Sequence, residues 1–171
     1  MHHHPSGPLV AALLVLALAT SGCGIPATGG SDDDDVPTGP IDTGRRTVSK
    51  LDHDLLAALQ DAARDAQEDG IELVVTSGWR SKAHQRRLLA QAVTRYGSEA
   101  EARRYVATPR TSAHVTGDAV DVGPTDGAYW LDRHGADYGL CQVFANEIWH
   151  FELATSPGGE CPALLPDGAS R

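Results

Sequence analysis

The segment SAHVTGDAVD occupies residues 112–121, and the segment EIWHFE occupies residues 147–152. Each segment contains an expected β-strand. Alternation along the second strand places His150 and Glu152 on one face. The other face then carries large apolar side chains that are expected to form core, namely Trp149, Phe151 and Leu153. Glu152 is therefore either a partner that orients a histidine or one half of a structural ion pair.

The two segments supply imidazole and carboxylate groups that are suited to a metal ion. His114, Asp121 and His150 match the three protein ligands that zinc hydrolases commonly use, with the fourth position left to water. Bound zinc lowers the pKa of its water, and a nearby carboxylate can then take the proton. Glu147 lies three residues before His150, so we expect it in the turn before the strand, leaning over the metal. The joint pattern favours a hydrolytic site with one Zn²⁺ per domain.

Three motifs in order support a more specific interpretation. The pattern S-x-H-x-x-G-x-A-x-D at 112–121, followed by E-x-W-H at 147–150, resembles the zinc D-alanyl-D-alanine carboxypeptidases and dipeptidases of the vancomycin-resistance type. The segment SGWRS at 77–81 is similar to a further motif of that family. The resemblance extends from residue 50 to residue 155 and implies the fold that this family shares with the hedgehog signalling domain.

The resemblance also implies roles for single residues. It assigns the zinc ligands to His114, Asp121 and His150, and it makes Glu147 the general base that acts on a zinc-bound water. Arg80 would stabilise the oxyanion that forms when water attacks the peptide carbonyl. The resemblance also implies that two polar residues, Ser112 and Gln85, help to hold the substrate.

Two positions between these motifs need comment. Gly117 would permit a tight backbone course between the first two ligands. Arg110 departs from the family pattern, which often has glycine there. Its side chain would reach either a substrate carboxylate or, as we prefer, solvent.

Hydrophobic periodicity extends this interpretation to the whole domain. Helices are expected over residues 51–66, 82–96, 98–107 and 126–134, and strands over residues 71–76, 119–122, 141–144 and 149–153. Helices and short strands are mixed without a regular repeat, which favours an α+β fold with a small, mostly antiparallel sheet and flanking helices.

The N-terminal region is expected to direct export. Residues 1–22 resemble a lipoprotein signal peptide, although histidines replace the usual Lys or Arg before the apolar core. Small residues precede Cys23, which would then carry a lipid anchor on the outer face of the membrane; ordinary cleavage nearby is the alternative. The polar residues 23–46 read as a flexible linker, followed by a peptidase domain at 47–163 and a tail at 164–171.

Two further cysteines, Cys141 and Cys161, lie in the domain. An even pair in a small exported domain is expected to form a disulfide. A pair of metal-binding thiolates is disfavoured, because neither cysteine has a Cys or His at ligand spacing.

Charge and composition exclude one class of partner. The chain has 171 residues, a net charge of −9 and few aromatic residues, which makes it a poor nucleic-acid binder. Basic residues gather between residues 80 and 110, either as a solvated helix face, which we prefer, or as a patch for an anionic polymer.

The preferred hypothesis is a monomeric, lipid-anchored zinc peptidase that removes the terminal D-Ala from peptidoglycan stem peptides. A related enzyme could instead cut a free D-Ala-D-Ala dipeptide or an L-Ala-D-Glu bond. A non-catalytic zinc or cell-wall-binding lipoprotein is the third hypothesis. The presence of both Glu147 and Arg80 argues against it.

Overall fold

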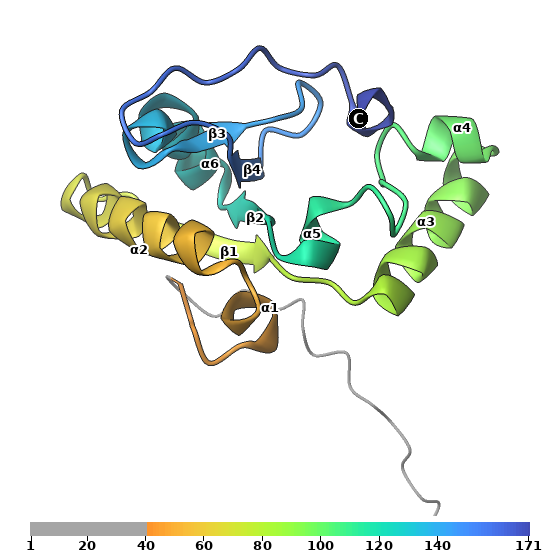
Figure 1. Ribbon diagram of the computed structural model, residues 1–171, viewed down its shortest axis with the longest axis horizontal. Coiled ribbons are helices and arrows are strands. Elements are labelled where there is room, and N and C mark those ends of the chain that lie inside the picture. Colours follow the sequence, from red (N-terminus) through yellow and green to blue (C-terminus); the bar gives the residue numbers. More distant parts are fainter. Residues whose placement is uncertain (1–40) are drawn as a thin grey trace, which may run out of the picture. The chain divides into compact units, whose positions relative to one another are not determined.

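The computed structural model describes residues 41–171 and confirms the expected α+β architecture (Figure 1). Its centre is an antiparallel sheet of four strands in the order β1-β2-β4-β3. The strands are β1 (Val74–Ser77), β2 (Ala119–Gly123), β3 (Leu140–Gln142) and β4 (His150–Leu153). Strand β2 therefore lies inside the sheet, and every one of its residues is buried.

Side-chain caps mark the beginning of the two longest helices. The helices are α1 (Arg46–Ser49), α2 (His53–Glu68), α3 (Lys82–Tyr96), α4 (Glu99–Ala102), α5 (Ala113–Thr116) and α6 (Thr125–His134), with 3-10 turns at Gly135–Tyr138 and Gly168–Ser170. Asp52 caps α2 by accepting hydrogen bonds from two backbone N–H groups. Ser81 caps α3 by accepting one hydrogen bond, from the backbone N–H of His84, and Gly97 ends α3 in the left-handed conformation.

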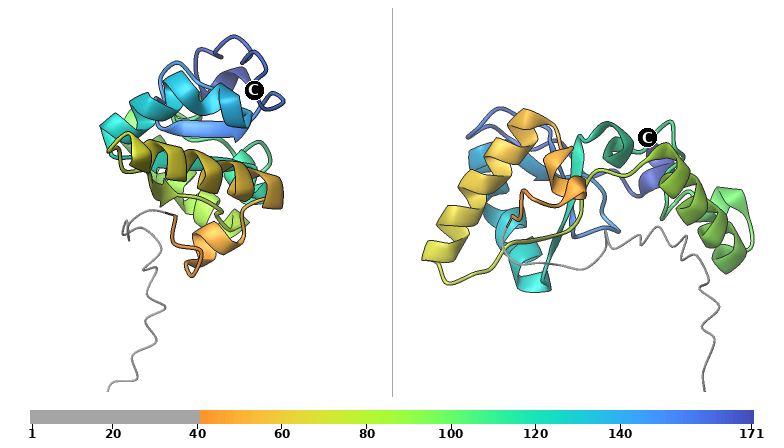
Figure 2. Two further views of the ribbon diagram at one scale, coloured as in Figure 1. Left: turned by 90° about the vertical axis from the view of Figure 1, so that its left-hand side faces the viewer. Right: turned by 90° about the horizontal axis from the view of Figure 1, so that it is seen from below.

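The core lies between the sheet and helices α2 and α6. Helix α2 buries residues at helical spacing, namely Leu55, Leu59, Ala62 and Ala66. Val120, Val122 and Phe151 meet them from the sheet. Helices α3 and α4 instead pack on each other, away from α2 and α6 (Figures 1 and 2). One end of the domain is thus an ordinary sheet-and-helix core, and the other carries a separate helical pair.

The expectation for the apolar face of β4 was wrong at two positions. Phe151 is fully buried, but Trp149 is 45% exposed and Leu153 is 37% exposed. Trp149 precedes the strand and lines a cavity, and Leu153 is the last residue of the strand. Alternation applies only within a strand, so it does not extend to Trp149, and it does not predict that burial ends before Leu153.

The helix expected over residues 98–107 is a single turn, α4. Ser98 caps it as expected, accepting from the backbone N–H of Glu101. The carbonyl of Arg104 accepts hydrogen bonds from the backbone N–H of Gly168 and from Asn146 Nδ2, both distant in the sequence. Tertiary donors thus take the place of the next helical turn. The strands expected at 71–76 and 141–144 are likewise shorter, as β1 and β3.

Residues 164–171, expected as a tail, pack against the domain, and we name them the C-terminal strap. Leu165 forms a parallel bridge with Phe144. Asp167 accepts a hydrogen bond from Arg104 Nε at 2.8 Å. Arg171 donates two hydrogen bonds to Glu152. The strap therefore joins the end of α4 to the turn before β4 and to β4 itself.

The structure contains the expected disulfide between Cys141 and Cys161, with the two Cα atoms 5.7 Å apart. Cys141 lies in β3, and Cys161 lies shortly before the strap, 20 residues later. The bond thus attaches the C-terminal segment to the edge strand of the sheet.

Removing this disulfide is expected to destabilise the domain. Cys161→Ser should lower the free energy of unfolding by about 3 kcal/mol, because the crosslink restricts the unfolded chain. Urea denaturation measures the change. Adding reductant to the wild type should reproduce the loss and should leave the variant unaffected. A wild type whose midpoint does not respond to reductant would contradict the prediction.

The signal peptide expected at 1–22, Cys23 and most of the linker expected at 23–46 lie outside the described residues. Within residues 41–171, no helix combines the length and the apolar character that crossing a bilayer requires.

Candidate active site

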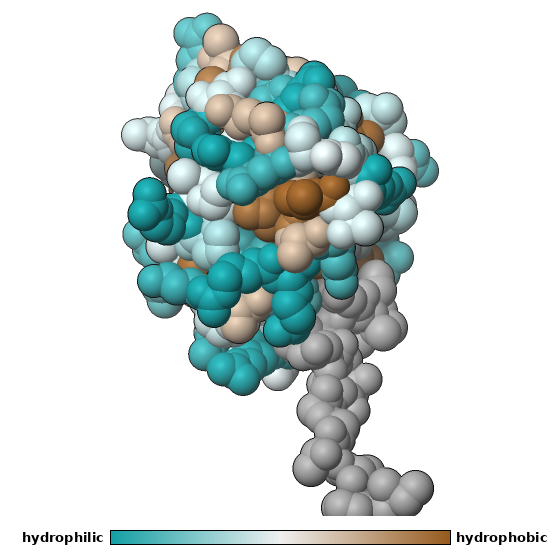
Figure 3. All heavy atoms as spheres, turned by 90° about the vertical axis from the view of Figure 1, so that its right-hand side faces the viewer, coloured by the Kyte–Doolittle hydropathy of each residue, from teal (hydrophilic) through white to brown (hydrophobic). Residues whose placement is uncertain are grey.

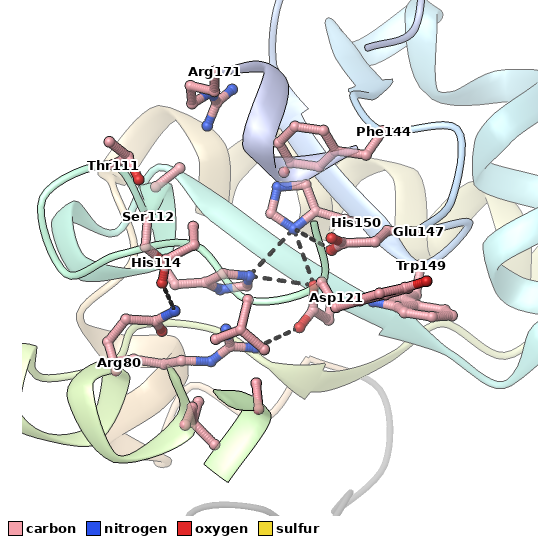
Figure 4. A pocket seen from close by; sticks show the side chains of 18 of the residues that line it. Arg80, Thr111, Ser112, His114, Asp121, Phe144, Glu147, Trp149, His150 and Arg171 are labelled. Carbon is pink, nitrogen blue, oxygen red and sulfur yellow. Dashed lines mark hydrogen bonds and ion pairs between the residues drawn. The ribbon is translucent and has the colours of Figure 1, made fainter. Parts of the chain in front are cut away.

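The pairing of β2 with β4 brings Asp121 and His150 together. The two residues are direct cross-strand partners, and directly opposed residues point to the same face of a sheet. The neighbouring pair, Val120 and Phe151, points into the core. Asp121 and His150 therefore point away from the core, and Figure 4 shows their side chains converging.

His114 reaches the same place from α5. Its ring Nδ1 lies 2.8 Å from the carbonyl oxygen of Gly78, and its own carbonyl accepts from the N–H of Arg80 at 2.9 Å. The loop after β1 thus holds both the ring and the backbone of His114. A carbonyl oxygen can only accept, so Nδ1 carries the proton and the Nε2 lone pair is turned towards Asp121 and His150.

Three electron-rich atoms meet at this point. His114 Nε2 lies 3.2 Å from His150 Nδ1 and 3.3 Å from Asp121 Oδ1, and His150 Nδ1 lies 3.2 Å from the same oxygen. All three side chains are buried, and their ligand atoms are suitably grouped for a metal ion. Lone pairs this close repel one another unless a proton or a metal cation lies among them. Two imidazole nitrogens and one carboxylate oxygen are a donor set that fits zinc.

Charge on Asp121 is strongly favoured in this setting. Burial alone would raise its pKa, but His114, His150 and Arg80 together hold that pKa far below the usual range. For His114, burial lowers the pKa in spite of the Asp121 carboxylate. For His150, burial also opposes the charged form, but hydrogen bonds to Asp121 and Glu152 outweigh it and raise the pKa to about 9. The Asp121 side chain is therefore held in its charged, carboxylate form.

Glu147 lies in the turn before β4, as the sequence predicts. Its backbone N–H donates to the carbonyl of Phe144, and its carbonyl accepts from the N–H of His150 at 3.1 Å. Its carboxylate Oε2 lies 3.9 Å from His150 Nδ1. Burial raises the pKa of Glu147 to about 7, against the opposing effect of His150. A carboxyl group that titrates near neutrality can exchange protons with water.

Arg80 lies next to the three ligand candidates. Its Nη2 donates to Asp121 Oδ2 at 2.6 Å, and its Nε donates to Ser77 Oγ at 2.9 Å. The guanidinium is therefore fixed at the site by two contacts. One of these contacts, to a ligand candidate, was not foreseen from the sequence.

Gln85 and Ser112 line the same cavity. Gln85 is 1% exposed, and its Nε2 donates to the carbonyl of Ala107 at 2.9 Å. Its Oε1 is buried without a hydrogen-bond partner among the described residues. Ser112 immediately precedes α5, but its hydroxyl does not cap that helix. Both side chains can therefore contact a substrate, a role that stays a prediction.

The cavity has a volume of about 320 Å³ and extends from the histidines to α3 (Figure 4). Trp149, Phe144 and Arg171 also line it, and the sequence had assigned no site role to any of the three. Arg171 and Phe144 meet through the strap, with the guanidinium carbon 5.3 Å from the ring centroid. No local sequence pattern predicts that Arg171 lines the cavity, because its partners, Glu152 and Phe144, lie elsewhere in the sequence.

Gly117 lies between the first two ligand candidates, where the backbone passes close to the carbonyl of Lys50. It has φ +92°, and an added Cβ would lie 2.6 Å from the carbonyl oxygen of Lys50. Gly117→Ala should therefore lower the free energy of unfolding by more than the ~1–2 kcal/mol of left-handed strain alone. Gly97→Ala is the matched control, because φ is +83° there and nothing lies within 4 Å. Equal losses in urea denaturation would show that the close approach to Lys50 relaxes at no cost.

The basic residues of α3 lie at the surface. Lys82, Arg86 and Arg87 are exposed, and so is Arg110. Seen from the side of α3 and α4, the molecule is mostly hydrophilic, with an apolar area near the centre of that face (Figure 3). This exposure is what a solvated helix face requires.

Comparison with known proteins identifies a family. The sequence model of the VanY D-alanyl-D-alanine carboxypeptidases matches residues 48–157. The D-alanyl-D-alanine carboxypeptidase of Enterococcus faecalis is 29% identical over 128 residues, which are 60% of this chain and 47% of that protein. The chain thus spans about half the length of this curated relative.

Two solved structures are also similar. A mutant of the vancomycin-resistance D,D-pentapeptidase VanY, in complex with Zn(II), is 26% identical with a TM-score of 0.56, over 64% of this chain and 73% of that one. The L,D-carboxypeptidase DacB of Streptococcus pneumoniae is 30% identical with a TM-score of 0.50, over 63% of this chain and 67% of that one.

Proposed function

Because the chain belongs to the VanY family of D-alanyl-D-alanine carboxypeptidases, we propose that it is a zinc-dependent D,D-carboxypeptidase. It would hydrolyse the bond to the terminal D-Ala of peptidoglycan stem peptides. The observation that carries the proposal is the convergence of His114 Nε2, Asp121 Oδ1 and His150 Nδ1 beside the carboxylate of Glu147. The family supplies the substrate class, and the site supplies groups that can do the chemistry.

His114, Asp121 and His150 would hold the zinc ion, each through the atom that faces the common centre. When bound, zinc would polarise the peptide carbonyl and lower the pKa of water. The donor set supports zinc, and so does the Zn(II) complex of the related VanY mutant.

Glu147 would act as the general base and take a proton from the attacking water. The same carboxyl group would then deliver the proton to the leaving amino group of D-Ala. Its pKa of about 7 suits both steps, since it can hold or release a proton near neutral pH. The turn from Phe144 to His150 keeps this carboxyl group next to the ligand candidates.

Arg80 would stabilise the negative charge that develops on the peptide oxygen. Its guanidinium needs no rearrangement, because Asp121 and Ser77 already hold it. Gln85 would accept an N–H of the substrate through its unpaired Oε1, since a buried acceptor without a partner is costly. Ser112, the residue before α5, would donate a hydrogen bond from its hydroxyl to the substrate.

A second candidate function has a specific observation in its favour. The similarity to the L,D-carboxypeptidase DacB favours a different bond within the same peptide class. A D-Ala-D-Ala dipeptidase and an L-Ala-D-Glu endopeptidase are the other enzymatic alternatives, and a non-catalytic zinc or wall-binding module is the last.

Purified protein should be incubated with a pentapeptide stem, a tetrapeptide stem and free D-Ala-D-Ala, and the products identified by mass spectrometry. The proposal expects release of one D-Ala from the pentapeptide and little reaction with the other two. Cleavage of the tetrapeptide alone would assign an L,D specificity, and hydrolysis of the free dipeptide would assign a dipeptidase. Protein treated with a chelator is the control and should be inactive on every substrate.

The site of action is also a proposal. We propose that the protein is exported and anchored through a lipid on Cys23. The disulfide between Cys141 and Cys161 supports export, because such bonds form in oxidising compartments. Peptidoglycan stem peptides lie in the same extracytoplasmic space.

A further inference from the structure

A chain of three side chains leads from the C-terminal strap to the candidate metal site. Arg171 donates from Nη1 to Glu152 Oε1 at 2.8 Å and from Nη2 to Glu152 Oε2 at 2.7 Å. Glu152 Oε1 in turn lies 2.9 Å from His150 Nε2. The two-point contact of Arg171 fixes the plane of the Glu152 carboxylate, and that carboxylate faces the ring nitrogen turned away from the metal site.

His150 has a carboxylate at each of its ring nitrogens. Glu152 lies at Nε2, and Asp121 lies at Nδ1 with an oxygen 3.2 Å away. Carboxylates only accept hydrogen bonds, and a neutral imidazole has a single N–H to donate. When His150 is neutral, as a metal ligand must be, the two carboxylates therefore compete for one proton. If the proton were shared with Asp121, it would lie on Nδ1, the nitrogen through which His150 would bind a metal.

The geometry favours Glu152 in this competition. Its contact to His150 is the shorter of the two, and Arg171 holds it in place. Asp121 is drawn instead to Arg80, which donates to its other oxygen at 2.6 Å. The side chains of Glu152 and Arg171 are 12% and 32% exposed, so water competes little for the contact between Glu152 and His150.

We propose that Glu152 and Arg171 are positioning residues that hold His150 in the tautomer whose Nδ1 can bind a metal. The inference rests on the zinc site of the proposed function, but not on which peptide bond is cleaved. Glu152 acts directly on His150, and Arg171 acts through Glu152. The strap, which the sequence had placed outside the domain, thus contributes to the site.

The test compares four variants by zinc affinity, measured by competition with a chelator of known affinity. Glu152→Ala should weaken zinc binding about 10- to 100-fold, the usual effect of losing a partner that orients a ligand. Glu152→Gln, whose amide oxygen still accepts from Nε2, should recover most of that loss. Arg171→Ala should weaken binding less than Glu152→Ala does. Asp167→Ala is the matched control, because it breaks another anchor of the strap without touching Glu152 or His150.

A second measurement detects the tautomer without any metal. Nitrogen-15 NMR of histidine-labelled, zinc-free protein, at a pH where the His150 imidazole is neutral, reports which nitrogen carries the proton. The wild type should carry it on Nε2, and Glu152→Ala should move it towards Nδ1. A residue that only stabilises the fold would not move it.

The outcomes separate this inference from the proposed function. A wild type that cleaves no stem peptide would end the proposed function, while a weakened zinc affinity in Glu152→Ala would still support the positioning role. Wild-type zinc affinity and an unchanged tautomer in Glu152→Ala would overturn the inference. Equal losses in Arg171→Ala and Asp167→Ala would also overturn it for Arg171, because packing of the strap would then be the cause.

Discussion

Glu147→Gln is expected to lower turnover on a D-Ala-terminated peptide by about a hundred- to ten-thousand-fold while the zinc content stays at the wild-type level. Glutamine keeps the size and hydrogen-bonding reach of glutamate but cannot accept a proton at neutral pH. The loss corresponds to roughly 3 to 5 kcal/mol of activation free energy. Steady-state kinetics and metal analysis of the same protein sample measure both quantities.

Glu160→Gln is the matched control, because Glu160 is exposed and lies outside the residues that line the cavity. It should have wild-type turnover. Loss of zinc in Glu147→Gln would make Glu147 a ligand instead of a base. Unchanged turnover would mean that another group takes the proton from water.

His114→Ala and His150→Ala are each expected to abolish stoichiometric zinc and, with it, all turnover. Each change removes one of the three ligand atoms that the described residues bring together. Metal analysis after dialysis gives the occupancy, and circular dichroism verifies that the variants remain folded. That check matters most for His114, whose ring also donates to the carbonyl of Gly78.

His53→Ala is the control for the loss of a histidine, because the His53 side chain is 94% exposed. It should keep one zinc ion per chain. Full occupancy in both His114→Ala and His150→Ala would refute the ligand assignment and would require another metal site or none.

The sequence could predict which residues come together at the candidate site because they lie in two compact motifs. Each motif places its members on consecutive elements. His114 lies on α5 and Asp121 on the next element, β2, while Glu147 lies in the turn that leads into β4 with His150. The spacing within a motif therefore translates into position. The α+β fold followed from helix and strand periodicity in the same way.

Features that depend on distant contacts could not be predicted. The cross-strand register of Asp121 with His150 is set by the assembled sheet. The exposure of Trp149 follows from its place before β4, where it lines the cavity. The carbonyl of Arg104, just beyond α4, accepts from donors that lie far away in the sequence. Arg171 lies 19 residues from Glu152 in a polar segment without periodicity, so nothing near it in the sequence indicates a role.

The pairing of β4 with β2, which lies well before it in the sequence, has a kinetic consequence. His150 lies 29 residues from Asp121 and 36 residues from His114, so the three ligand atoms meet only after β4 has added to β2. Closing such long stretches of chain is a slow, late event in the folding of β-proteins. Zinc would then arrive after the folding barrier has been crossed. Zinc should therefore leave the rate constant of refolding unchanged and lower the rate constant of unfolding.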